Sequence, residues 1–274
     1  MKQSITGFHA IEERLRYYKE KYCEKKSNIK QKKYSELSYR LYFDKKGPRI
    51  KKILDEAASL GIEAKQVGKA DLDRFVASLS SFAREHRGLV LIIEGEQEKK
   101  QEIDDIAAHL SALSVSKETE ASIVVVLDSI SDPHNVGAIL RSCDQFAVDL
   151  VIVPKRDAAL EGDVIARTSA GASAWVPLAI VSNLVRSVEI LKEAGYWIYG
   201  ADAGGKSVKK IQFEKKTCLL MGSEGRGIAR LLKESCDEIV SIPTFGKLDS
   251  LNVSVAAGIL LHEIRSSFEN STNN

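Results

Sequence analysis

The chain has 274 residues, more than one typical domain, so two domains are expected. Hydrophobic residues make up 44% and charged residues 28% of the sequence, as in globular proteins that bury a core. No run of about 18 apolar residues occurs and the amino terminus has no signal-peptide stretch, so a membrane protein is not expected.

The first segment, residues 1–95, is expected to form a small mixed domain. Its predicted elements are a helix from about Phe8 to Lys21, a strand at Leu41–Phe43, a helix at Ile50–Leu60 that ends at Gly61, and a strand at Leu89–Ile93. A charged, serine-rich linker, residues 96–121, follows with one short helix near Ile103–Leu113.

The net charge of +2 conceals a strongly basic block in the first domain. Residues 14–52 hold fifteen Lys or Arg and four acidic residues, a balance of 15 − 4 = +11, with tyrosines interleaved. Cations suit a phosphate backbone and aromatic rings suit stacking on bases, so the block predicts RNA binding. The alternative is a solvated basic face with no ligand.

From residue 122 to residue 274, apolar strands alternate with helices. The apolar runs are Ile123–Leu127, Leu150–Val153, Trp175–Val181, Tyr196–Gly200, Cys218–Met221 and Ile239–Ile242. The helical stretches are Val136–Phe146, Asn183–Ala194, Ile228–Cys236 and Leu251–Phe268. This alternation predicts a parallel sheet covered on both faces, with ligands beyond the carboxyl ends of its strands.

The loop after the first of these strands carries polar residues suited to a site. Pro133 fixes a turn, and Asn135 is expected to cap a helix that begins at about Val136. Arg141 then lies about two turns along this helix, where its permanent cation suits phosphate. A solvated surface charge is the ordinary alternative for such an arginine.

A glycine-rich loop, Gly222-Ser223-Glu224-Gly225-Arg226-Gly227, follows the strand that ends at Met221. Its glycines permit positive φ and close approach of backbone. The loop matches neither the dinucleotide fingerprint nor the P-loop, which argues against an NAD enzyme or an ATPase. Glu224 is either part of a site or an ordinary charge in the first turn of a helix.

The last loop leads into a long apolar helix. Ser250 is expected to be the helix N-cap, and Asn252 and Ser254 lie in the first turn although both are poor helix-interior residues. Buried polar groups need partners, so these side chains bond either to backbone or to a ligand.

The cysteines and histidines suggest no metal site. Cys23, Cys143, Cys218 and Cys236 are scattered without a Cys-x-x-Cys pair, a pattern that favours reduced thiols in the cytoplasm. Cys143 and Cys236 are expected to pack as small apolar residues. His9, His86 and His134 are expected to serve turns or caps rather than catalysis.

Together, the three loops resemble the three signature motifs of the SpoU/TrmH group of SPOUT RNA methyltransferases. The matching runs are 132–142, 221–227 and 242–256, within a resemblance that covers Ile123–Phe268 in the same order and spacing. Thr6–Ile11 and His86–Gly88 also resemble the small amino-terminal substrate domain of RlmB-like members, which methylate a guanosine of large-subunit (23S) rRNA.

The resemblance implies a fold, a cofactor and an assembly. The fold would be α/β, a SPOUT-type parallel sheet with a carboxyl-terminal trefoil knot, preceded by a small α+β substrate-binding domain. S-adenosylmethionine would be the cofactor, with no metal, and the enzyme would be a homodimer with its sites at the subunit interface. Its backbone contacts would be Gly222, Ile242 and Leu251, with Gly200 and Ala201 nearby.

The resemblance also implies residue roles. Arg141 would help activate a ribose 2′-hydroxyl, and Asn135, Glu224, Ser250 and Asn252 would shape the site. The predicted function is therefore S-adenosylmethionine-dependent 2′-O-methylation of structured RNA, most specifically 23S rRNA.

Three alternatives remain open: a tRNA ribose methyltransferase, a non-catalytic RNA-binding or ribosome-assembly factor, and a nucleotide-dependent enzyme acting on small molecules. Two segments depart from the family pattern, the Lys-rich insertion between Cys23 and Tyr39 and the run Lys247-Leu248-Asp249. Both bear on the identity of the RNA more than on the reaction.

Overall fold

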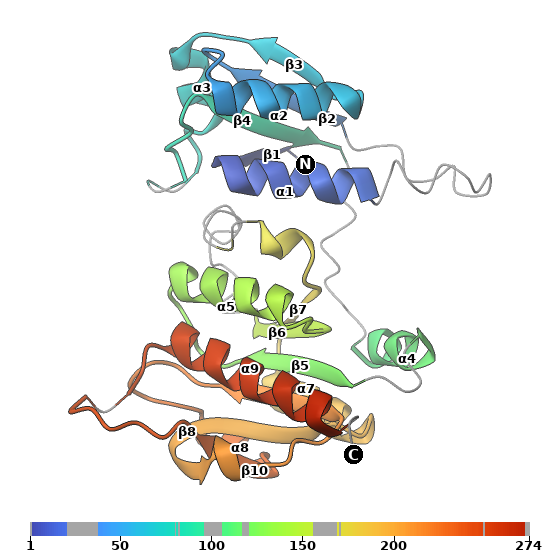
Figure 1. Ribbon diagram of the computed structural model, residues 1–274, viewed down its shortest axis with the longest axis vertical. Coiled ribbons are helices and arrows are strands. Elements are labelled where there is room, and N and C mark those ends of the chain that lie inside the picture. The colour runs from blue at the N-terminus through green and yellow to red at the C-terminus, as the bar shows by residue number, and fades with distance from the viewer. Residues whose placement is uncertain are drawn as a thin grey trace. The chain divides into compact units, whose positions relative to one another are not determined.

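The computed structural model divides the chain into two compact units (Figure 1). One unit comprises Met1–Lys100 together with Glu161–Trp175, and the other comprises Gln101–Leu160 together with Val176–Asn274. The structure describes residues 2–20, 38–79, 81, 83–95, 106–116, 121–155, 169, 171–248 and 250–271. Cys23, most of the Lys-rich insertion, much of the expected linker, and Asp249 lie outside this part of the chain.

The first unit is a four-stranded sheet in the order β1-β4-β2-β3. Strands β1 (Lys2–Ile5) and β2 (Ser38–Phe43) each pair antiparallel with β4 (Leu89–Glu94), and β3 (Glu63–Gln66) pairs parallel with β2. Helices α1 (Phe8–Tyr18) and α2 (Pro48–Ser59) share a core with one face. Helix α3 (Lys69–Phe75) packs on residues of the other face.

The predicted helices and strands of this unit are confirmed, but three of its elements were not expected. Strand β3 has the sequence Glu-Ala-Lys-Gln and is exposed throughout, so no apolar alternation marks it. The strand β1 and the helix α3 are only four and seven residues long, too short for a clear periodic signal.

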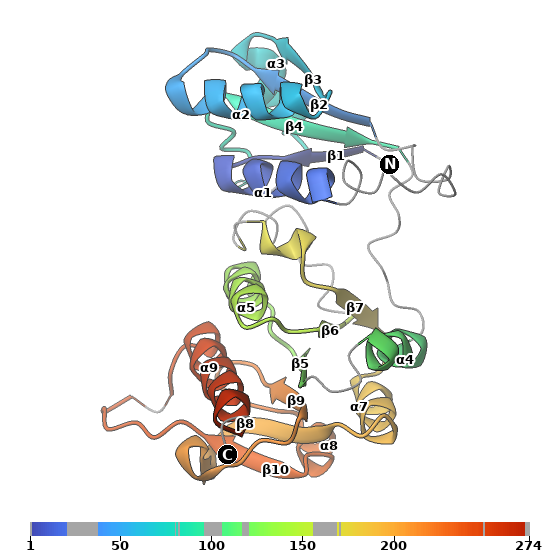
Figure 2. The same cartoon turned by 45° about the vertical axis from the view of Figure 1, so that its right-hand side comes forward.

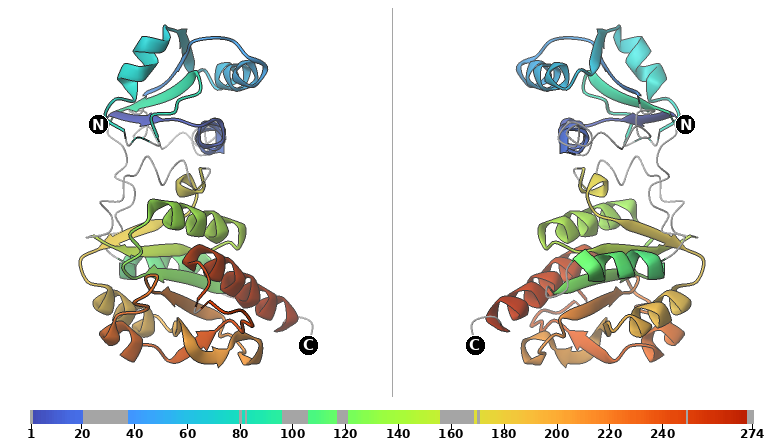
Figure 3. Two further views of the ribbon diagram at one scale, coloured as in Figure 1. Left: turned by 90° about the vertical axis from the view of Figure 1, so that its left-hand side faces the viewer. Right: turned by 90° about the vertical axis from the view of Figure 1, so that its right-hand side faces the viewer.

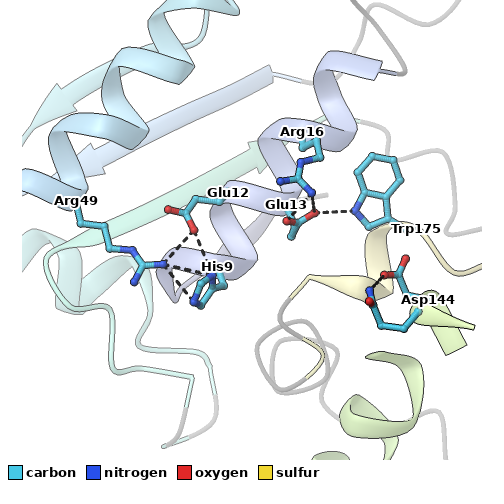
Figure 4. A network of polar contacts seen from close by, with 8 residues as sticks. His9, Glu12, Glu13, Arg16, Arg49, Asp144 and Trp175 are labelled. Atoms are coloured by element: carbon cyan, nitrogen blue, oxygen red, sulfur yellow. Dashed lines mark hydrogen bonds and ion pairs between the residues drawn. The ribbon is translucent and has the colours of Figure 1, made fainter. Parts of the chain in front are cut away.

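The expectation of a strand beginning at Trp175 was wrong. A 3₁₀ turn at Ala172–Ala174 precedes this residue, and the strand of that region begins only at Leu178. The Trp175 ring meets the Tyr17 ring edge-on at 5.3 Å, and its Nε1 donates to Glu13 Oε2 at 3.2 Å (Figure 4). A Cβ on Gly171 would lie 2.4 Å from that of Glu13, so this close packing on α1 requires a glycine.

The second unit contains a six-stranded sheet in which every pairing is parallel, in the order β10-β8-β9-β5-β6-β7. The strands are β5 (Ser122–Leu127), β6 (Leu150–Pro154), β7 (Leu178–Val181), β8 (Trp197–Ser207), β9 (Lys216–Met221) and β10 (Glu238–Ser241). The prediction of a parallel sheet is confirmed.

Helices cover both faces of this sheet (Figures 2 and 3). On one face lie α4 (Ile106–Ser116), α7 (Leu184–Glu193) and α8 (Arg230–Glu234), which share one core cluster with the strands. On the other face α5 (Pro133–Gln145) packs against α9 (Val253–Ser271). The trefoil knot implied by the family resemblance stays a prediction.

The cysteines of the described residues pack inside the second unit as free thiols. Cys143 and Cys218 are buried, and Cys236 is partly buried and donates to the Leu232 carbonyl at 3.3 Å. Burial raises the pKa of the Cys143 and Cys218 thiols and raises that of Cys236 to about 11. Among the described helices, none is long and apolar enough to cross a membrane.

The buried thiol of Cys218 predicts a pH dependence of stability. Its pKa is raised in the folded chain, so the unfolded chain loses this proton first as pH rises above about 8.5 and stability falls. We expect the difference in unfolding free energy between the unaltered chain and Cys218→Ala to shrink by about 1.4 kcal/mol per pH unit above that pH. Urea unfolding under reducing conditions measures it, and a constant difference would contradict the prediction.

Candidate active site at the carboxyl edge of the parallel sheet

Four neighbouring strands of the parallel sheet, β10, β8, β9 and β5, end at the same edge. Met221, at the end of β9, pairs with Leu127 on one side and with Ala201 on the other. The glycine-rich loop therefore leaves the sheet between the end of β5 and the Ala201 position of β8. This arrangement brings the expected cofactor residues of three strands to one edge.

The first loop enters its helix differently from the prediction. Asp132, not Asn135, is the N-cap of α5, and its carboxylate accepts from the His134 amide at 2.8 Å. Pro133 occupies the first helical position, where its missing N–H costs nothing. Asn135 consequently lies in the first turn, with its side chain available for another contact.

The glycine-rich loop folds back on itself. Ser223 and Gly227 exchange two backbone hydrogen bonds, of 3.1 and 2.9 Å, which enclose the three residues between them. A Cβ on Gly222 would lie 2.1 Å from the Gly227 carbonyl carbon, so the close return of the chain requires glycine there. Glu224 stands in this tight turn.

One carboxylate oxygen of Glu224 joins three segments of the chain. Glu224 Oε1 accepts from Asn135 Nδ2 at 3.1 Å, from Asn252 Nδ2 at 2.9 Å and from the Val253 amide at 3.3 Å. Asn252 Nδ2 also donates to Asn135 Oδ1 at 2.9 Å. The motif residues Asn135, Glu224 and Asn252, far apart in sequence, thus form one network.

Asn252 also caps α9, so the expectation that Ser250 is the N-cap was wrong. The Asn252 side-chain oxygen accepts from the amides of Ser254 and Val255 at 2.9 and 3.3 Å, and from the Ser254 hydroxyl at 2.6 Å. Both the nitrogen and the oxygen of the Asn252 side-chain amide therefore form hydrogen bonds. Ser250 is exposed and makes no hydrogen bond to the described residues.

Arg141 lies farther along α5 than Asn135, roughly 9 Å along the helix axis at 1.5 Å per residue. Its side chain is exposed, and within the described part of the chain no hydrogen bond or ion pair holds it. A guanidinium with five N–H donors on the helix that carries Asn135 is thus available to a ligand.

The glycines expected to contact the cofactor also have packing reasons to be glycine. A Cβ on Gly200 would lie 2.7 Å from Cys236 Sγ and 2.9 Å from Ile239 Cδ1. Beyond Gly200, strand β8 bulges, since Ile239 pairs with Gly200 whereas Val240 pairs with Lys206. This bulge, residues 201–205, lies at the edge between Gly222 and Ile242.

Sequence reasoning missed two aspartates that hold this edge together. Asp128 is buried at the end of β5 and accepts from the Ala229 amide at 2.8 Å and the Ser129 hydroxyl at 3.0 Å. Asp202, in the bulge, binds Lys233 at 2.8 Å, and this hydrogen bond lowers the pKa of its carboxyl. In the sequence, a polar residue directly after an apolar strand could have indicated such aspartates.

Two of the three histidines considered, His9 and His86, belong to the first unit, whereas the network lies in the second. His86 is buried, accepts from the Gly88 amide at 3.0 Å and contacts Asp73 at 3.1 Å, which confirms its predicted role in a turn. His9 contacts Arg49 and Glu12 in the first unit (Figure 4). His134 is exposed at the start of α5.

A family model for the SpoU rRNA methylases matches residues 122–262, which include the whole network. The chain belongs to the SpoU rRNA methylase family. This result confirms the predicted membership and makes the chain a methyltransferase by family.

Two curated relatives of this SpoU methylase match most of its length. It is 36% identical over 95% of its residues to "23S rRNA (guanosine-2'-O-)-methyltransferase RlmB" of Neisseria meningitidis serogroup B, covering 94% of that protein. It is 38% identical over 81% of its residues to an "Uncharacterized tRNA/rRNA methyltransferase" of Borreliella burgdorferi, covering 96% of it.

A solved structure supports the fold of this SpoU methylase. The SpoU methyltransferase AviRb of Streptomyces viridochromogenes, in complex with AdoMet, superposes with a TM-score of 0.67 at 21% identity. The match covers 97% of this chain and 89% of AviRb. At this identity the likeness confirms the SPOUT-type fold alone.

The network predicts unequal effects of two substitutions at Glu224. Glu224→Ala removes the acceptor that three donors share, and we expect methyl transfer to fall at least about 100-fold through misplaced site residues. Glu224→Gln keeps a carbonyl oxygen there and is expected to lose only about tenfold. Single-turnover rates with saturating S-adenosylmethionine measure both, and equal losses would contradict the acceptor role.

Proposed function

We propose that this SpoU methylase transfers a methyl group from S-adenosylmethionine to a ribose 2′-hydroxyl of structured RNA, with a guanosine of large-subunit (23S) rRNA as its target. The observation that carries the proposal is the Asn135–Glu224–Asn252 network, which holds the start of α5. The same helix carries Arg141, whose exposed guanidinium has no hydrogen bond or ion pair within the described part of the chain. With ribosomal RNA as its substrate, the enzyme would act in the cytoplasm.

The chemistry requires a group that makes a ribose hydroxyl a better nucleophile. In the transfer, a bond forms between the 2′-oxygen and the methyl carbon, the bond from that carbon to sulfur breaks, and the hydroxyl proton leaves. Arg141 would hold the hydroxyl and its neighbouring phosphate and stabilise the developing negative charge. Because Arg stays protonated, we assign the proton to a phosphate oxygen.

Asn135, Glu224 and Asn252 would act as positioning residues. Their mutual hydrogen bonds fix the start of α5, which carries Arg141, against the start of α9. Ser250 would contact the substrate side of the same site from the preceding loop.

The residues at the edge fit a nucleoside cofactor. Small residues in and beside the bulge of β8, among them the exposed Ala203 and Gly204, leave backbone donors and acceptors accessible. Leu251 is 37% exposed and offers an apolar surface suited to adenine. Gly200, Ala201, Gly222, Ile242 and Leu251 would hold S-adenosylmethionine, which supplies the electrophilic methyl group when bound.

We further propose that two copies of the chain form a homodimer through α9. Val255 and Ile259, one turn apart on this helix, are 50% and 36% exposed. Phe245 and Leu248, in the loop after β10, are 99% and 86% exposed. Large apolar side chains gathered next to the site loop favour burial against a second copy.

The dimer predicts that a charged α9 face would separate the subunits. Val255→Glu with Ile259→Glu places carboxylates in an apolar contact, so sedimentation should show monomers. A matched control is Leu231→Glu, since Leu231 is 57% exposed on α8, away from α9. A chain that sediments as the same dimer with both glutamates would contradict the α9 interface.

The role proposed for Arg141 predicts that Arg141→Ala impairs methyl transfer but not cofactor binding. Methyl transfer should fall at least about 100-fold because the transition state loses its cation, whereas the affinity for S-adenosylmethionine measured by calorimetry should stay within about threefold. Arg230→Ala, an exposed arginine of α8, is the control. Equal loss of binding and turnover would overturn the role given to Arg141.

The proposed function is tested by transfer of labelled methyl to separated ribosomal and transfer RNA pools, followed by mapping of 2′-O-methyl groups. Label on one 23S rRNA guanosine supports the proposal in full. Label on tRNA would keep the reaction and overturn the substrate. No label on any RNA, with S-adenosylmethionine bound, would overturn the reaction and favour a binding factor.

A further inference from the structure

We propose that Arg265, on α9, is a positioning residue for Arg141 in the methyl transfer. It acts from the carboxyl end of α5, where it holds that helix in place along α9. The inference rests on the proposed function, because it gives a residue outside the site loops a role in the same reaction.

Helices α5 and α9 lie side by side and run in the same direction (Figure 1). Near their first turns, Asn252 Nδ2 donates to Asn135 Oδ1 at 2.9 Å. At the carboxyl end of α5, the Phe146 ring meets the His262 ring of α9 edge-on, with the ring centroids 6.0 Å apart. Helix α9 therefore follows α5 from its first turn to its C-cap.

Arg265 binds the end of α5 through two backbone carbonyls. Its Nε donates to the Phe146 carbonyl at 2.7 Å, and its Nη2 donates to the Ala147 carbonyl at 2.6 Å. The carbonyls at the end of a helix lack partners within the helix and form the negative end of its dipole, so a guanidinium stabilises them. Because two donors of one planar group are used, the contact fixes the orientation of α5 as well as its distance from α9.

The turn that ends α5 has a strained backbone. Ala147 has a φ of 49°, in the left-handed region that favours glycine. Its amide donates to the Asp144 carbonyl at 3.1 Å, and the Val148 amide donates to the Cys143 carbonyl at 2.8 Å. Neither of these hydrogen bonds uses the carbonyls that Arg265 binds, so Arg265 adds a separate restraint on this turn.

Arg141 lies between the two attachments of α5 to α9. Along the helix axis it is roughly 9 Å beyond Asn135 and roughly 7.5 Å before Phe146, at 1.5 Å per residue. Between these points α5 buries apolar side chains such as Ile139 and Leu140, and the hydrophobic effect is not directional. The hydrogen bonds at the two ends therefore limit how far α5 can slide or tilt on α9.

The position of the Arg141 guanidinium follows any such movement of α5. In an active site, a displacement of about 1 Å can reduce the rate about 100-fold. A residue that fixes α5 from its far end can therefore affect catalysis without contacting the reacting atoms.

The surroundings of the two arginines differ in the way that these roles require. Arg265 is partly buried, with two carbonyls bound and its guanidinium 5.9 Å from the Phe268 ring. Arg141 is exposed and has no hydrogen bond or ion pair among the described residues. Arg265 therefore suits a positioning role, whereas Arg141 is available to the substrate.

The test measures single-turnover methyl transfer to deproteinised 23S rRNA by the full chain, with saturating S-adenosylmethionine. Arg265→Ala removes both donors, so we expect the rate to fall at least about tenfold while the affinity for S-adenosylmethionine stays within about threefold. Arg265→Lys keeps a cation with N–H donors and is expected to lose only about threefold. The control is Val188→Ala, which destabilises the buried face of α7 on the other side of the sheet and should keep the rate within about twofold.

A double-mutant cycle with Arg141→Ala separates positioning from a general effect on stability. If Arg265 acts through Arg141, adding Arg265→Ala to Arg141→Ala should cost less than about twofold, because the guanidinium to be positioned is already absent. A further tenfold loss in the double variant would overturn the inference. So would an unchanged rate in Arg265→Ala alone, or an equal loss in Val188→Ala.

Hydrogen exchange adds a measurement that needs no RNA. Arg265→Ala is expected to speed amide exchange in the last turn of α5, and Val188→Ala is not. Exchange as slow as in the unaltered chain would overturn the role of Arg265 in holding α5. In each of these cases the proposed function stands as long as the unaltered chain methylates RNA; if it methylates none, the proposed function and the inference both fail.

Discussion

The second unit depends on one carboxylate oxygen for its functional arrangement. Glu224 Oε1 takes hydrogen bonds from the first turn of α5 and from both the side chain and the backbone at the start of α9. A single acceptor shared by three donors sets how these two helices begin relative to the glycine-rich loop. The loop can present this oxygen only because Gly222 and Gly227 let the chain return on itself.

The basis for this network lies in parallel-sheet geometry. Strands β5, β9, β8 and β10 run in the same direction, so the segments that follow them meet at one edge. At this edge the buried Asp128 carboxylate also accepts a hydrogen bond from the Ala229 amide, which links the end of β5 to the start of α8. The site is therefore assembled by loops, whereas the apolar strands beneath supply rigidity.

Much of this architecture could be predicted from the sequence. Near-continuous apolar strands indicated the parallel sheet, and the motif resemblance brought Asn135, Glu224 and Asn252 into one site before any contact was known. Local rules failed where a distant partner decided the conformation. Asn135 and Ser250 looked like caps by propensity, but Asp132 and Asn252 cap the helices, which leaves Asn135 free to bond Glu224.

Other features had no sequence signal. The apolar run that begins at Trp175 is typical of a strand, yet the Trp175 ring packs on Tyr17 and its indole N–H donates to Glu13. These partners are about 160 residues away in the sequence, so a pattern of neighbouring residues cannot indicate the contact. Strand β3 is polar and exposed, so only its pairing with β2 defines it.

The most direct test of the central claim is a double-mutant cycle of Asn135→Ala and Asn252→Ala, read as kcat/KM for methyl transfer. If both side chains act through Glu224, the double variant should lose at least about tenfold less than the product of the two single losses, a coupling of about 1.4 kcal/mol. Strictly multiplicative losses would contradict the account, since the two residues would then act independently.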